Sequence, residues 1–360
     1  MMVLRPRLSA PSLLNRSATR ALACACAASL LLAGCSNSES SQNVSATPAA
    51  TPAQNYAYEG PAYPTPSYDI EGTIEALKTL SSDSMEGRAA GTTGGKKASQ
   101  FIMSKNDKLM RSQHGLIFPF ERAQGDGKSQ ELIKGTNLGI FMPGKAQDMN
   151  GPILVITAHY DHLGMKDGDI YNGADDNASG AAALLAITES FNASPPENNV
   201  MIVWLDAEEH GLAGAKAFAE HVRYFNGASA VNLNLDMIAQ SQEGELYMVG
   251  SYHTPALGPL MAKAAHETGL TLKFGHDRPE DADQDWTRLS DHGVFHEAGI
   301  PFVYFGVEDH PQYHKPTDTF ETLPLEFYKS SLKTVVNAAH ILDENLADLA
   351  RPAIDPKPAD

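Results

Sequence analysis

The chain has 360 residues, enough for one large domain or two ordinary ones. Hydrophobic residues make up 42% of it and charged residues 20%, as in ordinary globular proteins. The 44 acidic residues outnumber the 27 basic ones and give a formal net charge of -17, with no sizeable basic patch, which excludes a nucleic-acid-binding role.

Residues 1–34 have the pattern of a lipoprotein signal peptide. Several arginines precede an apolar run over residues 21–33, which at about 13 residues is too short to span a bilayer. The sequence LAGC follows and resembles a bacterial lipobox, in which Cys35 becomes the lipid-modified first residue of the mature chain. An ordinary signal peptide with a chance cysteine is the alternative. Ser36, rather than Asp, follows Cys35, which by analogy with Gram-negative lipoproteins favours the outer membrane. We therefore expect an extracytoplasmic lipoprotein that faces the periplasm or the cell surface.

The cysteines and the low-complexity segment set the limits of the folded part. All three cysteines lie in the signal peptide or at its end, so the mature domain is expected to have no disulfide and no Cys-ligated metal. Residues 35–68 are rich in Ser, Ala, Pro and Thr and predict a disordered tether. We expect a folded domain over residues 69–348 and a flexible tail over residues 349–360.

The pattern of apolar residues predicts an α/β fold. A first helix carries apolar residues at Ile70, Ile74, Leu77 and Leu80, and a glycine-rich loop over residues 81–95 follows it. This loop lacks the features of a phosphate-binding loop, since no strand precedes it and no Ser or Thr follows its lysine. Further helices are predicted at 96–113, 178–192, 211–223, 255–268 and 325–345, and strands at 136–142, 152–158, 200–206, 229–235, 246–249, 271–274 and 302–306. This alternation favours a mixed, largely parallel central sheet sandwiched by helices.

One stretch of the chain suggests a metal site. The predicted strand that begins at Ile153 delivers His159 and Asp161, whose side chains leave an extended backbone on the same side. A loop rich in Gly and Asp then brings in Asp175 and Asp176, directly before a helix. This order collects imidazole and carboxylate ligands at one edge of a sheet.

Three later strands repeat this arrangement. Polar residues follow each of them, namely Glu208 and Glu209, then Asp236, and finally Tyr313, His314 and Asp318. The carboxyl ends of strands in open α/β sheets are where such proteins place their sites. A divalent cation would relieve the repulsion between Glu208 and Glu209, because one could ligate it while the other stays free to move a proton. A solvated helix start is the alternative for this pair.

The motifs around these residues resemble a known family. HYDHLG, GADDNASG, DAEEHGLAGA, NLDMIA, SDHGVFHEAGIP and YHKPTDT occur in family order over about residues 69–345 and resemble the M28 family of co-catalytic zinc peptidases. That family has a mixed-sheet α/β fold and two zinc ions bridged by an aspartate and a water or hydroxide. The resemblance implies a dinuclear zinc exopeptidase with two Zn²⁺ per chain that acts on peptide substrates, most simply an aminopeptidase.

The resemblance also implies the metal ligands, position by position. His159 and His314 would be the imidazole ligands, one on each zinc ion. Asp176 would bridge the two ions. Asp236 would complete the zinc held by His159, and Glu209 the zinc held by His314.

Three catalytic roles follow from the same resemblance. Glu208 would be the general base that takes a proton from the bridging water and returns it to the leaving amine. Asp161 would hold the second ring nitrogen of His159. Tyr313 would donate a hydrogen bond to the carbonyl oxygen as the tetrahedral oxyanion forms.

Other polar residues near the motifs have weaker assignments. His162 is a competing metal ligand, and Asp175 is expected to cap backbone groups or to support the ligands. We expect Asp318 to orient His314. The remaining candidates are Asp291 and His292, expected to shape the pocket, and the histidines expected on the surface or in loops: His210, His253, His266, His276, His296 and His310.

Two other functions stay open at this point. One is a glutaminyl cyclase-like acyltransferase on the same fold with a single zinc ion. The other is a non-catalytic binding protein, which predicts missing ligands. The sequence does not separate aminopeptidase from carboxypeptidase or dipeptidase activity. It contains neither His-Glu-x-x-His nor Gly-x-Ser-x-Gly, which argues against two rival hydrolase mechanisms.

Overall fold

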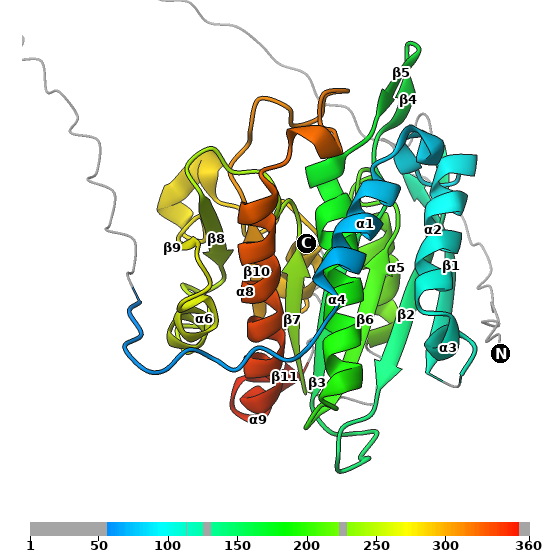
Figure 1. The fold of residues 1–360 in the computed structure, drawn as a ribbon. Coiled ribbons are helices and arrows are strands. Elements are labelled where there is room, and N and C mark those ends of the chain that lie inside the picture. Colours follow the sequence, from blue (N-terminus) through cyan, green and yellow to red (C-terminus); the bar gives the residue numbers. More distant parts are fainter. Residues whose placement is uncertain (1–55, 113, 125–130, 223–228, 353–360) are drawn as a thin grey trace, which may run out of the picture. The chain divides into compact units, whose positions relative to one another are not determined.

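A mixed nine-stranded sheet forms the centre of the computed structural model, which describes residues 56–112, 114–124, 131–222 and 229–352. The strands run in the order β1-β2-β6-β3-β7-β10-β8-β9, and β11 pairs with β7 (Figure 1). Their bounds are β1 Gly115–Gln124, β2 Glu131–Met142, β3 Ile153–His159, β6 Asn199–Leu205, β7 Ser229–Leu235, β8 Glu245–Val249, β9 Thr271–Phe274, β10 Phe302–Gly306 and β11 Arg351–Pro352. A separate hairpin, β4 (Gly164–Lys166) with β5 (Asp169–Tyr171), projects from one edge of the molecule (Figure 1).

The central strands are parallel, whereas several outer pairs are antiparallel. β3 pairs in parallel with both β6 and β7, and β10 pairs in parallel with β7. β1 with β2, β2 with β6 and β8 with β10 are antiparallel. The carboxyl ends of β3, β6, β7 and β10 therefore meet at one edge of the sheet. This confirms the predicted mixed, largely parallel α/β fold.

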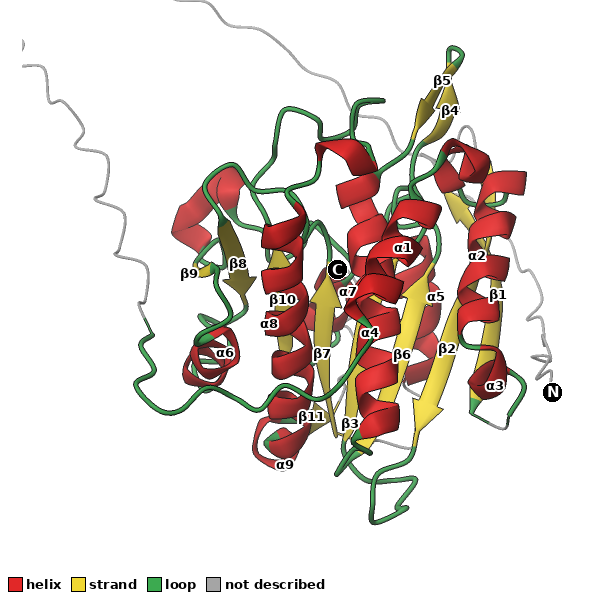
Figure 2. Cartoon of the chain, in the orientation of Figure 1, coloured by secondary structure: helices red, strands yellow, loops and turns green. Residues whose placement is uncertain are grey.

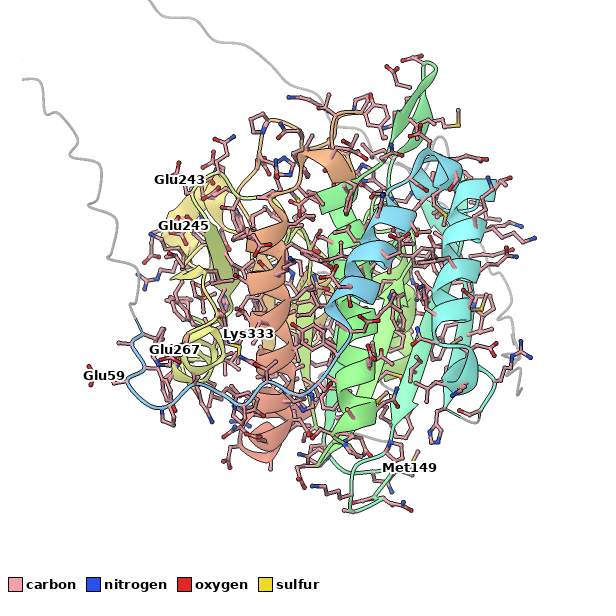
Figure 3. All side chains as sticks on the ribbon, viewed as in Figure 1. Glu59, Met149, Glu243, Glu245, Glu267 and Lys333 are labelled. Atoms are coloured by element: carbon pink, nitrogen blue, oxygen red, sulfur yellow. The ribbon has the colours of Figure 1, made fainter. Side chains whose placement is uncertain are left out.

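Helices cover both faces of the sheet (Figure 2). α1, α4 and α8 lie over one face, and α5 and α7 lie over the other (Figure 2). The helices are α1 Ile70–Leu80, α2 Thr93–Lys105, α3 Asp107–Met110, α4 Gly180–Ala193, α5 Ala213–Val222, α6 Leu257–Ala265, α7 His292–Glu297, α8 Leu325–Glu344 and α9 Leu346–Leu349. α6 packs beside α8, where Lys333 Nζ donates to the carbonyl oxygen of Glu267, 3.0 Å away (Figure 3).

The alternation of side chains along β3 builds two cores. Leu154 and Ile156 point into the larger core, under α1, α4 and α8. Ile153 and Val155 point into the second core, under α5 and α7. Successive residues of a strand face opposite sides, so a strand buried on both faces is apolar throughout rather than alternating. Trp204 fixes α4 to the sheet, because its indole Nε1 donates to the Ala181 carbonyl at 2.8 Å.

Two local predictions differ from the structure. The helix expected over residues 96–113 ends at Lys105, because Asn106 leaves helical geometry and its side chain donates to the Ile102 carbonyl. The following segment contains a strand that the sequence analysis did not predict, β1, which pairs with β2 over its whole length. The side chains of β1 alternate in exposure, and that of Ile117 is exposed to solvent. β1 is therefore an edge strand with one covered face.

The ordered domain is longer at both ends than predicted. Tyr56 packs edge-on against Phe274, with ring centroids 4.9 Å apart, and the hydroxyl of Tyr63 donates to Glu344 at 2.7 Å. Tyrosines with partly buried rings thus hold residues 56–68 against the domain, and the expected tether cannot extend to residue 68. At the other end, residues 351–352 form β11, so the predicted flexible tail starts too early at residue 349.

The predicted membrane attachment concerns a part of the chain that the structure does not cover. The signal peptide and Cys35 lie outside the described residues, and both stay predictions. Within the described residues, no helix is long and apolar enough to cross a bilayer.

A buried histidine in α8 predicts how the free energy of unfolding depends on pH. His340 Nε2 lies 2.9 Å from Ser190 Oγ, and its ring stacks on Phe191. Burial lowers the pKa of His340 from 6.5 to about 4, so the folded state disfavours the protonated ring. The stability that the neutral ring contributes is complete above pH 6.5 and is lost as the pH falls from 6.5 towards 4.

We therefore expect the His340→Gln variant to lose less stability on acidification than the wild type. Over this pH window the wild type should lose roughly 2–3 kcal/mol more of its free energy of unfolding than the variant. Denaturant titrations of both proteins at several pH values measure this difference. Parallel pH profiles would contradict it.

Candidate metal centre

Four strands deliver the candidate ligands to one edge of the sheet. His159 is the last residue of β3, and Asp236 directly follows β7. Glu209 lies in the turn between β6 and α5, and His314 lies in the loop after β10. Asp176 belongs to the turn Ala174–Ser179, directly before α4. Each residue thus lies at or past the carboxyl end of a strand, or directly before a helix.

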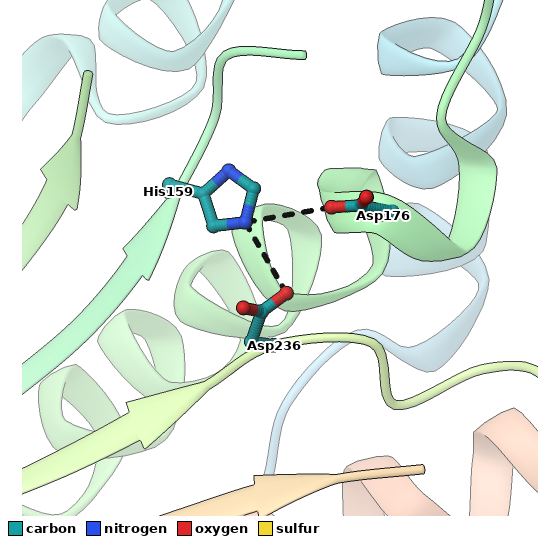
Figure 4. A group of neighbouring side chains, drawn as sticks. All are labelled: His159, Asp176 and Asp236. Carbon is teal, nitrogen blue, oxygen red and sulfur yellow. Dashed lines mark hydrogen bonds and ion pairs between the residues drawn. The ribbon is translucent and has the colours of Figure 1, made fainter. Parts of the chain in front are cut away.

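The first group of ligands contains His159, Asp176 and Asp236. Nε2 of His159 lies 3.2 Å from Oδ1 of Asp236 and 3.5 Å from Oδ1 of Asp176. The three side chains are buried and point toward one another (Figure 4). Their ligand atoms are close enough to hold one cation.

The second group uses the other oxygen of Asp176. Nε2 of His314 lies 3.1 Å from Oδ2 of Asp176 and 3.7 Å from Oε2 of Glu209. One carboxylate thus presents Oδ1 to the first group and Oδ2 to the second. The structure therefore gathers all five predicted ligands, and Asp176 lies between the two groups.

A sixth residue, His162, also joins the second group. Its Nδ1 lies 2.8 Å from Oε1 of Glu209 and 3.6 Å from Oδ2 of Asp176. The ring is completely buried, and burial lowers the pKa of His162 to about 3, so it is neutral. A neutral imidazole is the form that binds metals. From the sequence, His162 is only a competing ligand, but in the structure it lies closer to Glu209 than His314 does.

Several carboxyl groups are buried close together around the two groups of ligands. Burial raises the pKa of Asp291 to about 8, and it raises those of Asp206 and Asp318 to about 7. Burial likewise raises the pKa of Glu209. Uncompensated charges of one sign are costly in a buried site, and bound cations offset them. The nitrogen and oxygen donors here are those that zinc prefers, so the residues fit a zinc site.

Glu208 lies beside the two groups but belongs to neither. Burial raises its pKa well above the usual value, and His159 opposes this rise. Its main-chain N–H donates to Oδ1 of Asp161 at 3.0 Å, and the N–H of Glu209 donates to Oδ2 of the same carboxylate at 3.4 Å. Asp161 therefore fixes the turn that carries both glutamates, a contact that sequence spacing does not reveal.

Asp161 also lies against His159, as expected. Nδ1 of His159 is 3.2 Å from the main-chain oxygen of Asp161 and 3.6 Å from its carboxylate. This contact leaves Nε2 of His159 facing Asp176 and Asp236. The expected orienting role of Asp161 stays a prediction.

The turn around Asp176 is held by Asp318. Oδ2 of Asp318 accepts from the main-chain N–H groups of Asp175 and Asp176, both at 3.1 Å. We expected Asp318 to orient His314, but its carboxylate contacts this turn instead, since two N–H groups at the start of a helical turn attract an anion.

Asp175 caps a backbone group and supports the same turn, as predicted. Oδ1 of Asp175 accepts from the N–H of Ala239 at 2.6 Å, and its Oδ2 lies 3.1 Å from Nε2 of His310. His310 lies in a loop, as expected, but it is buried by this contact.

Three further residues, Tyr313, Asp291 and His292, lie around the two groups of ligands. Tyr313 stacks on His314, with ring centroids 3.9 Å apart, and burial raises the pKa of its hydroxyl. Asp291 is completely buried near His159 and Asp236, and neither of its oxygens has a hydrogen-bond partner among the described residues. His292 turns its Nε2 to the carbonyl oxygen of Trp286, 2.9 Å away. Both Asp291 and His292 are therefore buried, and Asp291 lies near two ligands of the first group.

The chain belongs to peptidase family M28. The model of that family matches residues 137–339, which contain all the candidate ligands. Aminopeptidase YwaD of Bacillus subtilis is 30% identical over 214 residues, 55% of this chain and 43% of that protein. A probable leucine aminopeptidase of Arthroderma otae is 26% identical over 245 residues, 65% of each protein. The chain thus matches less than half of the first relative and about two thirds of the second.

Solved structures share the fold. BSAP, a zinc aminopeptidase from Bacillus subtilis, superimposes with a TM-score of 0.60 at 18% identity, over 81% of this chain and 99% of that one. A glutaminyl cyclase of Fimbriiglobus ruber gives a TM-score of 0.61 at 19% identity, over 79% and 97%. At these identities the similarity shows the fold and leaves the reaction open.

Proposed function

We propose that this chain is a dinuclear zinc aminopeptidase that releases the first residue from peptides with a free N-terminus. The observation that supports this most is the shared carboxylate of Asp176, whose two oxygens lie near separate imidazole and carboxylate groups. A shared carboxylate is the simplest way for side chains to hold two cations close together. Aminopeptidases among the relatives support the choice of reaction.

The residues have distinct parts in this proposal. Bound zinc would activate the attacking water and polarise the carbonyl of the scissile bond. Glu208 takes the proton from that water and passes it to the leaving amine, a role open to it because it lies beside the two groups and belongs to neither. Asp161 keeps Glu208 and His159 in position through the contacts described above.

Tyr313 is the proposed donor to the developing oxyanion. Burial raises the pKa of its hydroxyl, with Asp176 and Asp236 adding to the rise, so the hydroxyl keeps its proton at neutral pH. Its stacking on His314 keeps it beside the second group. A protonated hydroxyl at that place is suited to stabilise negative charge on the carbonyl oxygen.

An acidic cavity whose lining residue His310 contacts Asp175 is suited to the free amine of a substrate. It has a volume of about 520 Å³, and acidic residues at its lining include Glu243, Glu245, Glu308 and Asp309 (two of them labelled in Figure 3). His310, which contacts Asp175, also lines it. The negative charge of this cavity would attract substrates that carry a free ammonium group.

A comparison of peptides with free and blocked N-termini tests the proposed function. Aminoacyl anilides and short peptides should release free amino acids, and their N-acetylated counterparts should not be hydrolysed. Equal hydrolysis of the blocked peptides would contradict an aminopeptidase. Cyclisation of an N-terminal Gln without release of an amino acid would instead identify a glutaminyl cyclase.

The shared position of Asp176 predicts a specific pattern of metal loss. Asp236→Asn removes a ligand from the first group only, and this variant should keep the ion of the second group. Asp176→Asn removes an oxygen from both groups and should weaken both ions. Zinc content after dialysis, measured by mass spectrometry for the wild type and both variants, checks this. Equal zinc loss in the two variants would contradict a bridging role.

A further inference from the structure

The glycine-rich loop before α2 buries an arginine against the metal centre. Arg88 lies in the short 3-10 segment Asp83–Arg88 and has no solvent exposure. Gly87, the residue before it, has a φ of +65°. A side chain at Gly87 would meet the main-chain oxygens of Gly164 and Tyr171 at 2.4 and 2.5 Å. The glycine therefore lets the loop approach the β4–β5 hairpin closely enough to deliver Arg88.

The guanidinium group of Arg88 is surrounded by main-chain carbonyls. Nε donates to Tyr160 at 2.9 Å, and Nη1 donates to Leu80 at 2.8 Å and to Asn172 at 2.5 Å. Nη2 donates to Gly173 at 2.9 Å and lies 3.5 Å from the oxygen of Asp176. Among the described residues, all of its hydrogen bonds go to such carbonyls and none to a carboxylate.

These carbonyls belong to three separate segments of the metal centre and its support. Leu80 ends α1, where unpaired carbonyls attract a cation. Tyr160 lies between His159 and Asp161. Asn172 and Gly173 lead into the turn that carries Asp176. One side chain thus connects the segment of the first imidazole ligand to the segment of the bridging carboxylate.

Arg88 also brings a positive charge into a strongly acidic region. Burial lowers its pKa to about 10, which still leaves it protonated at neutral pH, and nearby Asp176 and Asp318 oppose the decrease. A buried guanidinium without a paired carboxylate is costly, and a protein keeps one only where its hydrogen bonds and neighbouring charges compensate. The carbonyls of this site provide the hydrogen bonds, and the ligand carboxylates provide the charge.

We propose that Arg88 is a positioning residue of the metal centre, which fixes the turn of Asp176 against the end of β3 and offsets the charge of the ligand carboxylates. The zinc part of this proposal rests on the proposed function. Arg88 touches neither substrate nor the reacting atoms. It acts through the main chain of the ligand segments, so its loss should loosen the ligands while leaving each of them present.

Zinc affinity of full-length variants tests the proposal. Arg88→Gln removes the charge and most of the donors, and competition with a chromogenic chelator should give zinc binding about 10–100-fold weaker than in the wild type. Arg88→Lys should lose less affinity, because the ammonium keeps the charge but has three N–H donors where the guanidinium has five. This partial rescue separates a positioning role from general damage.

A matched control removes stability elsewhere in the domain. Leu342 is completely buried near the end of α8, beside Asp343, which binds the main chain just before β6 at the opposite edge of the sheet. Leu342→Ala should lower Tm but keep the wild-type zinc affinity. The proposal would be overturned if Arg88→Gln kept a zinc affinity within twofold of the wild type. If Arg88→Gln does not fold, the same result in Arg88→Lys would overturn it. Equal affinity loss in Leu342→Ala would also overturn it.

Hydrogen exchange of the chelated proteins gives a readout that needs no metal. The amides of residues 172–178 should exchange faster in the Arg88 variants than in the wild type or in Leu342→Ala. Unchanged protection of this segment would overturn the positioning role, whatever the wild type binds. A wild type that binds no zinc but shows faster exchange in the variants would contradict the proposed function and leave the positioning role supported.

Discussion

Glu208→Gln is expected to lower kcat on the order of 10²–10⁴-fold, the usual size of a general-base contribution. The amide has nearly the same shape as the carboxylate but cannot accept the proton of the attacking water. Zinc content should stay at the wild-type level, because Glu208 belongs to neither group of ligands. Steady-state kinetics on an aminoacyl anilide, with metal analysis of the same samples, measures both quantities.

Two control variants make this result specific. Glu209→Gln replaces a neighbouring ligand and should lose zinc as well as activity. Glu220→Gln makes the same chemical change at an exposed residue paired with Arg122 and should leave both unchanged. A Glu208→Gln variant that keeps more than about a tenth of the wild-type kcat would contradict the general-base role.

Chelation should abolish activity and destabilise the fold. Loss of the metal removes several kcal/mol of transition-state stabilisation, so kcat should fall on the order of 10³-fold or more. A ligand present at a hundred times its Kd stabilises the folded state by about 2.7 kcal/mol, so each lost ion should lower the unfolding free energy by roughly that amount. The crowded carboxylates add to the destabilisation once the cations that offset them are gone.

Dialysis against a chelator, followed by zinc addition, checks this prediction. Activity should disappear and return with added zinc, and Tm should fall and recover in parallel. Mock-dialysed protein is the control for losses from handling. Full activity after exhaustive chelation would contradict a metal-dependent reaction.

The sequence was sufficient for most of the fold because its strands are buried on both faces. The run Ile153–Ile156 is apolar throughout, as is typical of a strand buried on both faces of a sheet. β1 was harder to predict, because the residues of an edge strand alternate between a covered and an exposed face. Its segment also contains Pro119. The tyrosines of residues 56–68 were assigned to the tether, because composition does not show which rings find a surface to cover.

The candidate site was predictable where each ligand directly follows a strand or begins a helix. His159, Asp176 and Asp236 are of this kind, and their motifs carry the family resemblance. His162 is different, because the alternation of the strand no longer applies beyond His159 and only the tertiary fold brings its ring to Glu209. Arg88 had no local signal at all, since its partners are main-chain carbonyls of segments distant in sequence.

Anomalous diffraction at the zinc edge, from crystals grown with zinc, tests the central claim most directly. We expect two peaks, one beside His159 and Asp236 and one beside His314 and Glu209, with an oxygen of Asp176 next to each. The same map shows whether His162 coordinates the second ion. A single peak, or peaks remote from these residues, would contradict a dinuclear centre.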